Sequence, residues 1–151
     1  MTGQDAIKFF HWTRSRTIKI LQSLFVETLD YKLPSKKPRK DSPGKIRRIL
    51  KHIVQAEVGW IHRLVMKEKE AENYDISTMG IEEIIALLER TRAKTVKWLE
   101  ENKDKPLEFP YGKKASTHVA WIMYHVAEHE AYHLGQIVLI AEMNGQQIPW
   151  I

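Results

Sequence analysis

One segment, from Val119 to Ile140, restricts the fold of this chain more than any other, because as a helix it would be apolar on nearly all sides. Such a helix is normally buried. Within it, His125, His129 and His133 recur every four residues, which places them one turn above another on the same helical face. Buried imidazoles need hydrogen-bond or metal partners. The segment therefore predicts a buried helix whose histidines have a use, such as binding a divalent metal ion.

The rest of the chain also has the pattern of helices, in which apolar residues recur at the spacing of one helical face. We expect helices at about residues 5–29, 43–70, 80–101 and 117–144. The segments between the first and second helices and between the third and fourth contain prolines, which break helix interiors. Four amphipathic helices of this length predict an all-α four-helix bundle, formed by a single domain over residues 1–151.

Three helix boundaries have recognisable sequences. Thr2 and Asp5 have the spacing of a capping box at the first helix start. Ser42-Pro43 fits an N-cap followed by proline at the first helical position. Asn144-Gly145 fits a left-handed helix end. These residues predict where the first, second and fourth helices begin or end.

Composition excludes several classes of protein. No apolar run reaches the roughly 18 residues of a membrane span, and the first residues lack the basic-then-apolar order of a signal peptide. We therefore expect a cytoplasmic protein without a membrane segment. The chain contains no cysteine, so a nucleophilic thiol would have to come from another molecule.

Positive charge is concentrated in the segment from Lys32 to Lys51, which contains nine lysines and arginines and one acidic residue, Asp41. Such a segment could bind phosphates or acidic partners. Neither stacking aromatic residues nor a nucleic-acid-binding motif accompanies it, which favours a solvated loop and helix start. A basic nucleic-acid-binding module is the lesser alternative.

A metal site in a bundle is built from side chains on facing helices, so a further ligand should lie outside the last helix. The remaining histidines are His11, His52, His62 and His118. At about 100° per residue, His52 lies at the edge of the apolar stripe of its helix, whereas His62 lies nearly opposite and should be exposed. The spacing permits His52 without selecting it, and it leaves open whether His125 or His133 pairs with His129.

Two motifs carry a resemblance to a known family: KHIVQAEVGWIHRL in the second helix and HVAEHEAYHLGQI in the last. Together they resemble the DinB/YfiT-like metalloenzymes. The likeness covers nearly the whole chain, including the aromatic first helix, the third helix and the terminal NGQQIPWI. It implies a four-helix bundle with a three-histidine metal site. The implied ligands are His52, His129 and His133.

Around these ligands the sequence offers three supporting residues. The family usually has Arg-Gly-Gln after its last histidine, whereas Leu-Gly-Gln follows His133 here, which removes the contacts of that arginine but keeps the ligand pair. Gln136 is either a hydrogen-bond partner of a ligand or an exposed polar residue. We expect His125 to be a supporting or core histidine, hydrogen-bonded to a neighbour that orients a ligand. Glu57 lies on the apolar stripe of its helix, so it should be a buried carboxylate that orients a ligand, acts as a base, forms a salt bridge or pairs with a helix end.

A site of three neutral imidazoles leaves an open coordination position, as in catalytic zinc sites. Bound water would have its pKa lowered toward roughly 7, and a bound thiol would be deprotonated. The resemblance thus implies a metal-dependent transferase that uses a small-molecule thiol cosubstrate, or a hydrolase, with the catalytic residues unassigned. Zinc or nickel is favoured, although histidine ligands also suit iron and copper. A non-catalytic metal-binding protein of a stress or DNA-damage response is the alternative.

Tryptophans occur once in each expected helix, at Trp12, Trp60, Trp98 and Trp121. Large aromatic side chains usually fill the core, and we expect these four to do so. An exposed subset would instead indicate a contact between two copies. The family resemblance implies a homodimer, although the sequence does not indicate its interface.

Overall fold

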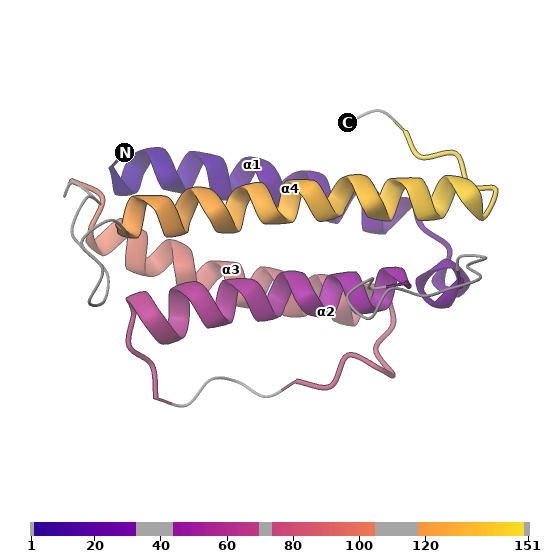
Figure 1. Cartoon of the computed structure of the whole chain (residues 1–151), viewed down its shortest axis with the longest axis horizontal. Coiled ribbons are helices and arrows are strands. Elements are labelled where there is room, and N and C mark those ends of the chain that lie inside the picture. The colour runs from indigo at the N-terminus through magenta and orange to yellow at the C-terminus, as the bar shows by residue number, and fades with distance from the viewer. Residues whose placement is uncertain (1, 33–43, 70–73, 105–117, 150–151) are drawn as a thin grey trace.

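Four long helices account for most of the computed structural model, which describes residues 2–32, 44–69, 74–104 and 118–149. In chain order the elements are α1 (Gly3–Ser23), the 3-10 helix η1 (Val26–Asp30), α2 (Ile46–Glu57), the π-helix η2 (Val58–Val65), α3 (Ile81–Glu101) and α4 (Val119–Met143). Helix α1 packs against α3 and α4, and α2 packs against the same two helices. Figure 1 shows α1 and α4 running in one direction and α2 and α3 in the other. The expected all-α four-helix bundle is confirmed.

The helix ends follow the local sequence at two of the three boundaries. Thr2 and Asp5 form the expected capping box, in which the backbone N–H of Asp5 donates to Thr2 Oγ1 and the backbone N–H of Thr2 donates to the Asp5 carboxylate. Gly145 ends α4 with a φ of 82°, in the left-handed region that favours glycine. Ser42-Pro43 lies outside the described residues. Helix α1 ends at Ser23, earlier than expected, because the chain turns into η1.

The second helix changes its geometry at Val58, where α2 continues as the π-helix η2. The backbone N–H of Met66 donates to the carbonyl of Ile61, five residues earlier, at 2.8 Å. A π-helix has more residues per turn, so each residue advances by less than 100°. His62 consequently points into the bundle and is only 3% exposed. The expectation that it lies on the surface was wrong, because it extended the α-helical angle through this segment.

Two clusters of apolar side chains fill the two ends of the bundle. One contains Leu21, Leu50, Leu88 and Ile137, and the other contains Phe10, Ile61, Leu99 and Ile122, each with further members. Buried threonines, arginines and glutamates lie between them: Thr13, Arg14, Thr17, Glu57, Thr91, Arg92, Thr95 and Glu130. A polar layer therefore divides the core, near the middle of α1, α3 and α4 and at the point where α2 continues as η2.

The tryptophans do not all fill the core. Trp60 and Trp98 are partly buried, but Trp12 and Trp121 are 52% and 48% exposed. Trp12 lies on α1 and Trp121 on α4. The expectation was wrong for these two, because one-per-helix spacing does not reveal which helical face is buried.

None of the helices in the described part of the chain is long and apolar enough to cross a membrane. In the basic segment, residues 33–43 lie outside the described residues. Arg47 belongs to the described part of the basic segment and has a structural role. Its guanidinium donates to the Asp30 carboxylate and to the backbone carbonyls of Ile76 and Met79.

Candidate metal centre

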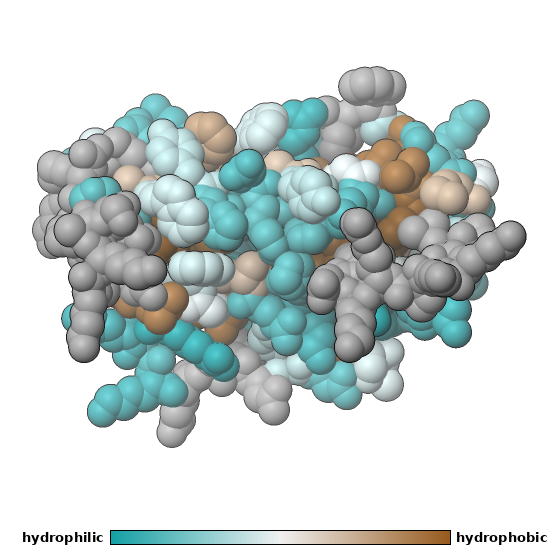
Figure 2. Space-filling view, in the orientation of Figure 1, coloured by the Kyte–Doolittle hydropathy of each residue, from teal (hydrophilic) through white to brown (hydrophobic). Residues whose placement is uncertain are grey.

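Three imidazoles converge between α2 and α4. His129 and His133 lie one turn apart on α4, and His52 faces them from α2. The Nε2 atom of His129 is 2.9 Å from Nε2 of His52 and 3.1 Å from Nε2 of His133. One ligand atom from each of the three residues lies within 4.8 Å of the others. Hydrophilic side chains cover the middle of the face formed by α4 and α2 (Figure 2), and His52 is itself exposed.

A hydrogen bond fixes the tautomer of His133. Its Nδ1 lies 2.7 Å from Oε1 of Gln136, which can only accept, so Nδ1 carries the proton. The Gln136 amide nitrogen in turn donates to the Tyr132 hydroxyl at 3.1 Å, which holds the amide in this orientation. The lone pair of His133 therefore sits on Nε2 and points at the other two imidazoles. Of the two roles that the sequence left open for Gln136, the structure supports the hydrogen-bond partner.

Burial disfavours the charged form of two of the three imidazoles, His129 and His52. Burial lowers the pKa of His129 to about 4, with the neighbouring His133 and His52 acting in the same direction. Burial and His133 also lower the pKa of His52. A protonated His129 Nε2 can direct its proton at only one neighbour and has no lone pair with which to accept, and an unprotonated one cannot donate to the lone pair of His133, so at most one of the two close contacts is a hydrogen bond. A divalent cation fits this donor set, since it would accept all three lone pairs.

His125 lies one turn before this group but takes part in a different cluster. Its ring stacks on Trp121, with centroids 4.8 Å apart and planes 7° apart, and it meets the edge of Trp60 at 5.5 Å. Its centroid is 5.9 Å from that of His129. The structure thus brings together His129 and His133 rather than His125 and His129. His125 contacts the site through its ring, and no described hydrogen bond joins it to a ligand.

Glu57 is fully buried, as the sequence predicted, and forms salt bridges. Its carboxylate accepts from Arg14 Nη2 at 2.8 Å, from Arg92 Nε and Nη2 at 2.8 and 3.0 Å, and from the Thr95 hydroxyl at 2.6 Å. His62 Nε2 lies 3.0 Å from that hydroxyl, whose proton goes to Glu57, so His62 is the donor in this contact. Of the roles that the sequence left open for Glu57, its contacts match the salt bridge.

The same two arginines bind a second carboxylate. Glu130, on α4, accepts from Arg14 Nε at 2.8 Å, from Arg92 Nη2 at 2.6 Å and from the Thr17 hydroxyl at 2.8 Å. Arg14, Glu57, Arg92 and Glu130 come one from each long helix, and we call them the Arg–Glu quartet. Its four side chains are at most 5% exposed.

The two carboxylates of the quartet are held in their ionised form by the arginines. Burial alone would raise the pKa of Glu57, but Arg92 and Arg14 outweigh it and lower this pKa to about 2. For Glu130 too, burial opposes ionisation, and Arg14 and Arg92 outweigh it and lower the pKa. Burial would lower the pKa of Arg14, but Glu130 and Glu57 raise it. Two positive and two negative charges thus balance in the polar layer.

Three members of the quartet were missed from the sequence, although a signal was present. Arg14 lies four residues after Phe10, Arg92 four after Leu88 and Glu130 four before Leu134, so each charge stands in an apolar stripe. A charged residue in such a register is buried or faces a partner. Each arginine needs an opposite charge, and Glu57 and Glu130 were the acids in the same register.

A family model describes the DinB family and matches residues 2–151, essentially the whole chain. The chain belongs to the DinB family. No curated protein matches the sequence. The expected family is therefore confirmed, and the three-histidine group lies where the resemblance implies a metal site.

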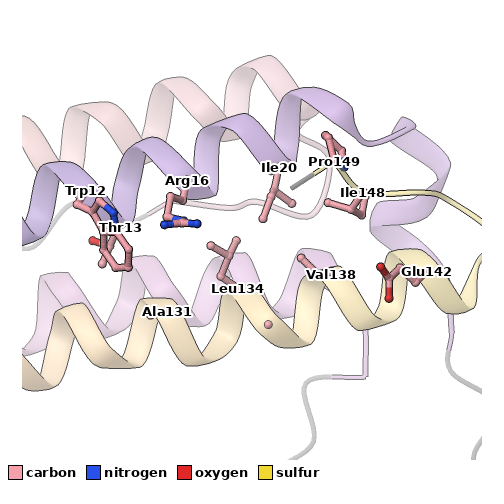
Figure 3. A pocket seen from close by; sticks show the side chains of 11 residues that line it. Trp12, Thr13, Arg16, Ile20, Ala131, Leu134, Val138, Glu142, Ile148 and Pro149 are labelled. Carbon is pink, nitrogen blue, oxygen red and sulfur yellow. The ribbon is translucent and has the colours of Figure 1, made fainter. Parts of the chain in front are cut away.

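A groove of about 350 Å³ lies between α1 and α4, on the other side of α4 from the three histidines. Figure 3 shows the Arg16 guanidinium and the Leu134 and Val138 side chains between the two helices, with Trp12 at one end and Glu142 toward the other. The groove is mostly apolar and carries one charge of each sign.

Proposed function

We propose that this DinB-family protein binds one divalent metal ion through His52, His129 and His133 and is a metal-dependent enzyme. The observation that carries the proposal is the convergence of three Nε2 atoms from two helices, at 2.9 and 3.1 Å, with the tautomer of His133 fixed by Gln136. Imidazole nitrogens that lie this close without a hydrogen bond in each contact are unfavourable unless a cation joins them. We favour zinc or nickel, and imidazole ligands also suit iron and copper.

The chemistry follows from the donor set. A divalent ion held by three neutral nitrogens keeps its charge and an open position, and there it lowers the pKa of bound water or of a bound thiol. Gln136 would keep the proton of His133 on Nδ1 and so keep Nε2 available. Tyr132 would hold Gln136 in place.

Two reaction types fit this site: transfer to an external thiol, and hydrolysis. We favour the thiol-dependent transferase, implied by the family resemblance, with a small-molecule thiol as cosubstrate, because the chain supplies no cysteine of its own. We place the protein in the cytoplasm, where small thiols are abundant and reduced. A non-catalytic metal-binding role is the second candidate, since the geometry supports binding independently of turnover.

Elemental analysis tests metal binding directly. The metal-loaded protein, freed of excess ions, should retain about one divalent ion per chain. His52→Ala and His129→Ala should lose it, whereas His125→Ala, whose ring lies in the neighbouring aromatic cluster, should keep it. Wild-type protein that retains no zinc, nickel or iron would refute the proposal. A panel of thiols with electrophilic substrates then separates the enzyme from the non-catalytic metal-binding protein.

We further propose that the protein is a homodimer formed through the α1–α4 face. Trp12, at the end of the groove, and three further large side chains of α1 and α4 are about half exposed: Phe9 at 48%, Trp12 at 52%, Tyr124 at 50% and Leu139 at 56%. Their uncovered area is roughly 400 Å², from 150–250 Å² for a large aromatic side chain, against about 800 Å² per partner in a standard interface.

Sedimentation equilibrium at micromolar concentrations tests the dimer. Leu139→Glu should shift the protein to the monomer. Leu64→Glu is the matched control, because Leu64 is also exposed but lies on η2, away from this face. A wild-type monomer, or dissociation by both variants alike, would contradict the proposed interface.

A further inference from the structure

The Arg–Glu quartet connects the two helices that carry the three histidines. Glu57 lies on α2, five residues after His52, which is about 7.5 Å along the helix axis at 1.5 Å per residue. Glu130 directly follows His129 on α4. Arg14 and Arg92 each bind both carboxylates, at 2.6 to 3.2 Å. Helices α2 and α4 are therefore joined through shared guanidiniums close to the histidines.

These hydrogen bonds set the relative position of α2 and α4 more precisely than apolar packing would. A guanidinium donates in fixed directions within one plane, so its bonds to carboxylates tolerate little sliding or rotation. Arg14 is anchored on α1 and also donates to the backbone carbonyl of Leu88 on α3, and Arg92 is anchored on α3 and also donates to that of Phe10 on α1. A slide of α2 along α4 would break several bonds of the quartet at once.

A metal centre depends on the same relative position. His52 reaches the site from α2 and the other two histidines from α4, so a slide of one helix by one residue, about 1.5 Å, would separate the converging nitrogens. Metal ligands must be held to within about 0.5 Å of their working positions. Helix α2 keeps α-helical geometry from His52 through Glu57, and the π-helix begins only at Val58. The position of Glu57 is therefore transmitted to His52 without a break in the helix.

Stability alone does not account for such a group. Removing four charges from water is costly, and well-packed apolar side chains in place of a buried ion network are often equally stable or more stable. Apolar side chains, however, form no directional bonds and would hold the register of the helices less precisely. We propose that the Arg–Glu quartet is a positioning device for the metal centre: it sets the register between α2 and α4 that brings His52 to His129 and His133. This inference rests on the proposed metal binding.

Zinc affinity, measured by competition with a chromophoric chelator, tests the positioning role. Arg92→Lys keeps the charge but removes the planar donor geometry, and Glu57→Gln keeps the shape but removes the charge. Each should weaken zinc binding at least tenfold, in the range of other groups that orient ligands from outside the site. The control is Ile84→Ala, which truncates a fully buried apolar side chain of α3 and should destabilise the fold without removing a charge of the quartet. It should bind zinc within about twofold of wild type.

A fourfold variant covers the case in which the single substitutions do not fold. Arg14→Met, Glu57→Met, Arg92→Met and Glu130→Met together remove every charge of the quartet and should restore a stable bundle. We expect this variant also to bind zinc at least tenfold more weakly. Wild-type zinc affinity in any folded quartet variant would overturn the inference.

A metal-free measurement separates this inference from the proposed function. The ring centroids of His52 and His129 are 4.6 Å apart, so samples kept free of metal by chelator should show nuclear Overhauser contacts between the two rings. The quartet variants should lose these contacts, and Ile84→Ala should keep them. If wild type binds no metal but these contacts depend on the quartet, only the proposed function fails; if the contacts persist in the quartet variants, the positioning role fails.

Discussion

Removal of the negative charge of Glu57 should be among the most destabilising single changes in this protein. Glu57→Gln preserves the size of the side chain but leaves two arginines facing one carboxylate in the middle of the core. The shift of the Glu57 pKa from 4.5 to about 2 corresponds to about 3 kcal/mol of stability at neutral pH, at 1.36 kcal/mol per pKa unit. Removal of one partner from a buried ion pair independently suggests about 3–5 kcal/mol. We therefore expect a loss of about 3 kcal/mol at pH 7.

The shift of the Glu57 pKa also determines how the stability lost in Glu57→Gln depends on pH. Because the pKa of Glu57 is lower in the folded state than in the unfolded state, its contribution is complete above about pH 5 and disappears as the pH falls toward 2. Roughly half of the contribution should be gone by pH 3.5, from the same two pKa values. The stabilities of wild type and Glu57→Gln should therefore converge in acid.

Urea unfolding of the metal-free proteins at pH 7, 5, 4 and 3.5, followed by circular dichroism and tryptophan fluorescence, measures this difference. Chelator in every sample removes the contribution of bound metal. Glu128→Gln is the matched control, because Glu128 is exposed on α4 and its replacement should change stability by less than about 0.5 kcal/mol. A difference below about 1 kcal/mol at pH 7, or one that does not shrink between pH 5 and 3.5, would refute the assignment of Glu57 as a buried ionised carboxylate.

Three further predictions follow from the site and from two glycines. Free zinc at 1,000 times its dissociation constant should stabilise wild type by about 4 kcal/mol in thermal or urea unfolding, with no gain in His52→Ala and reversal by chelator. Gln136→Leu should weaken zinc binding by about 10- to 100-fold in chelator competition while changing the unfolding free energy little, since it removes the partner of His133 Nδ1 on a partly exposed side chain. Gly3→Ala should lower the free energy of unfolding in urea by about 1–3 kcal/mol, because a Cβ there would lie 2.6 Å from the backbone of Lys103. A Cβ at Gly135 would meet nothing within 4 Å, so Gly135→Ala should raise the unfolding free energy of the monomer by up to about 1 kcal/mol. Equal effects of the two alanine substitutions would contradict this packing.

The sequence predicted the bundle because the signals for it are local. Apolar stripes, prolines and a capping box at Thr2 depend on neighbouring residues, and these were interpreted correctly. The three histidines that converge were named from the family resemblance, since spacing alone left the partner of His129 open. His62 was misplaced because a π-helix changes the angle per residue, and no local signal announced it. Trp12 was misplaced because the spacing of aromatic residues says nothing about which face is covered.

The Arg–Glu quartet was missed for a different reason. Each of its members is an ordinary charged residue when its own helix is considered, and only Glu57 was recognised as lying on an apolar stripe. Its meaning depends on four residues separated by up to 116 positions in the sequence. Charges that stand in apolar registers of different helices, equal in number and opposite in sign, are the pattern that would have revealed it.

The arrangement of the quartet also bears on how the chain folds. Each of the four charges lies on a different helix. A compact state with only three docked helices would therefore bury three charges, one of them not balanced by an opposite charge. Such a state costs several kcal/mol relative to one in which all four helices meet. Partly assembled bundles are therefore disfavoured. The last helix should dock in its native position at the same step at which all four charges lose their water. The layer that divides the core in two thus makes its assembly a single cooperative event.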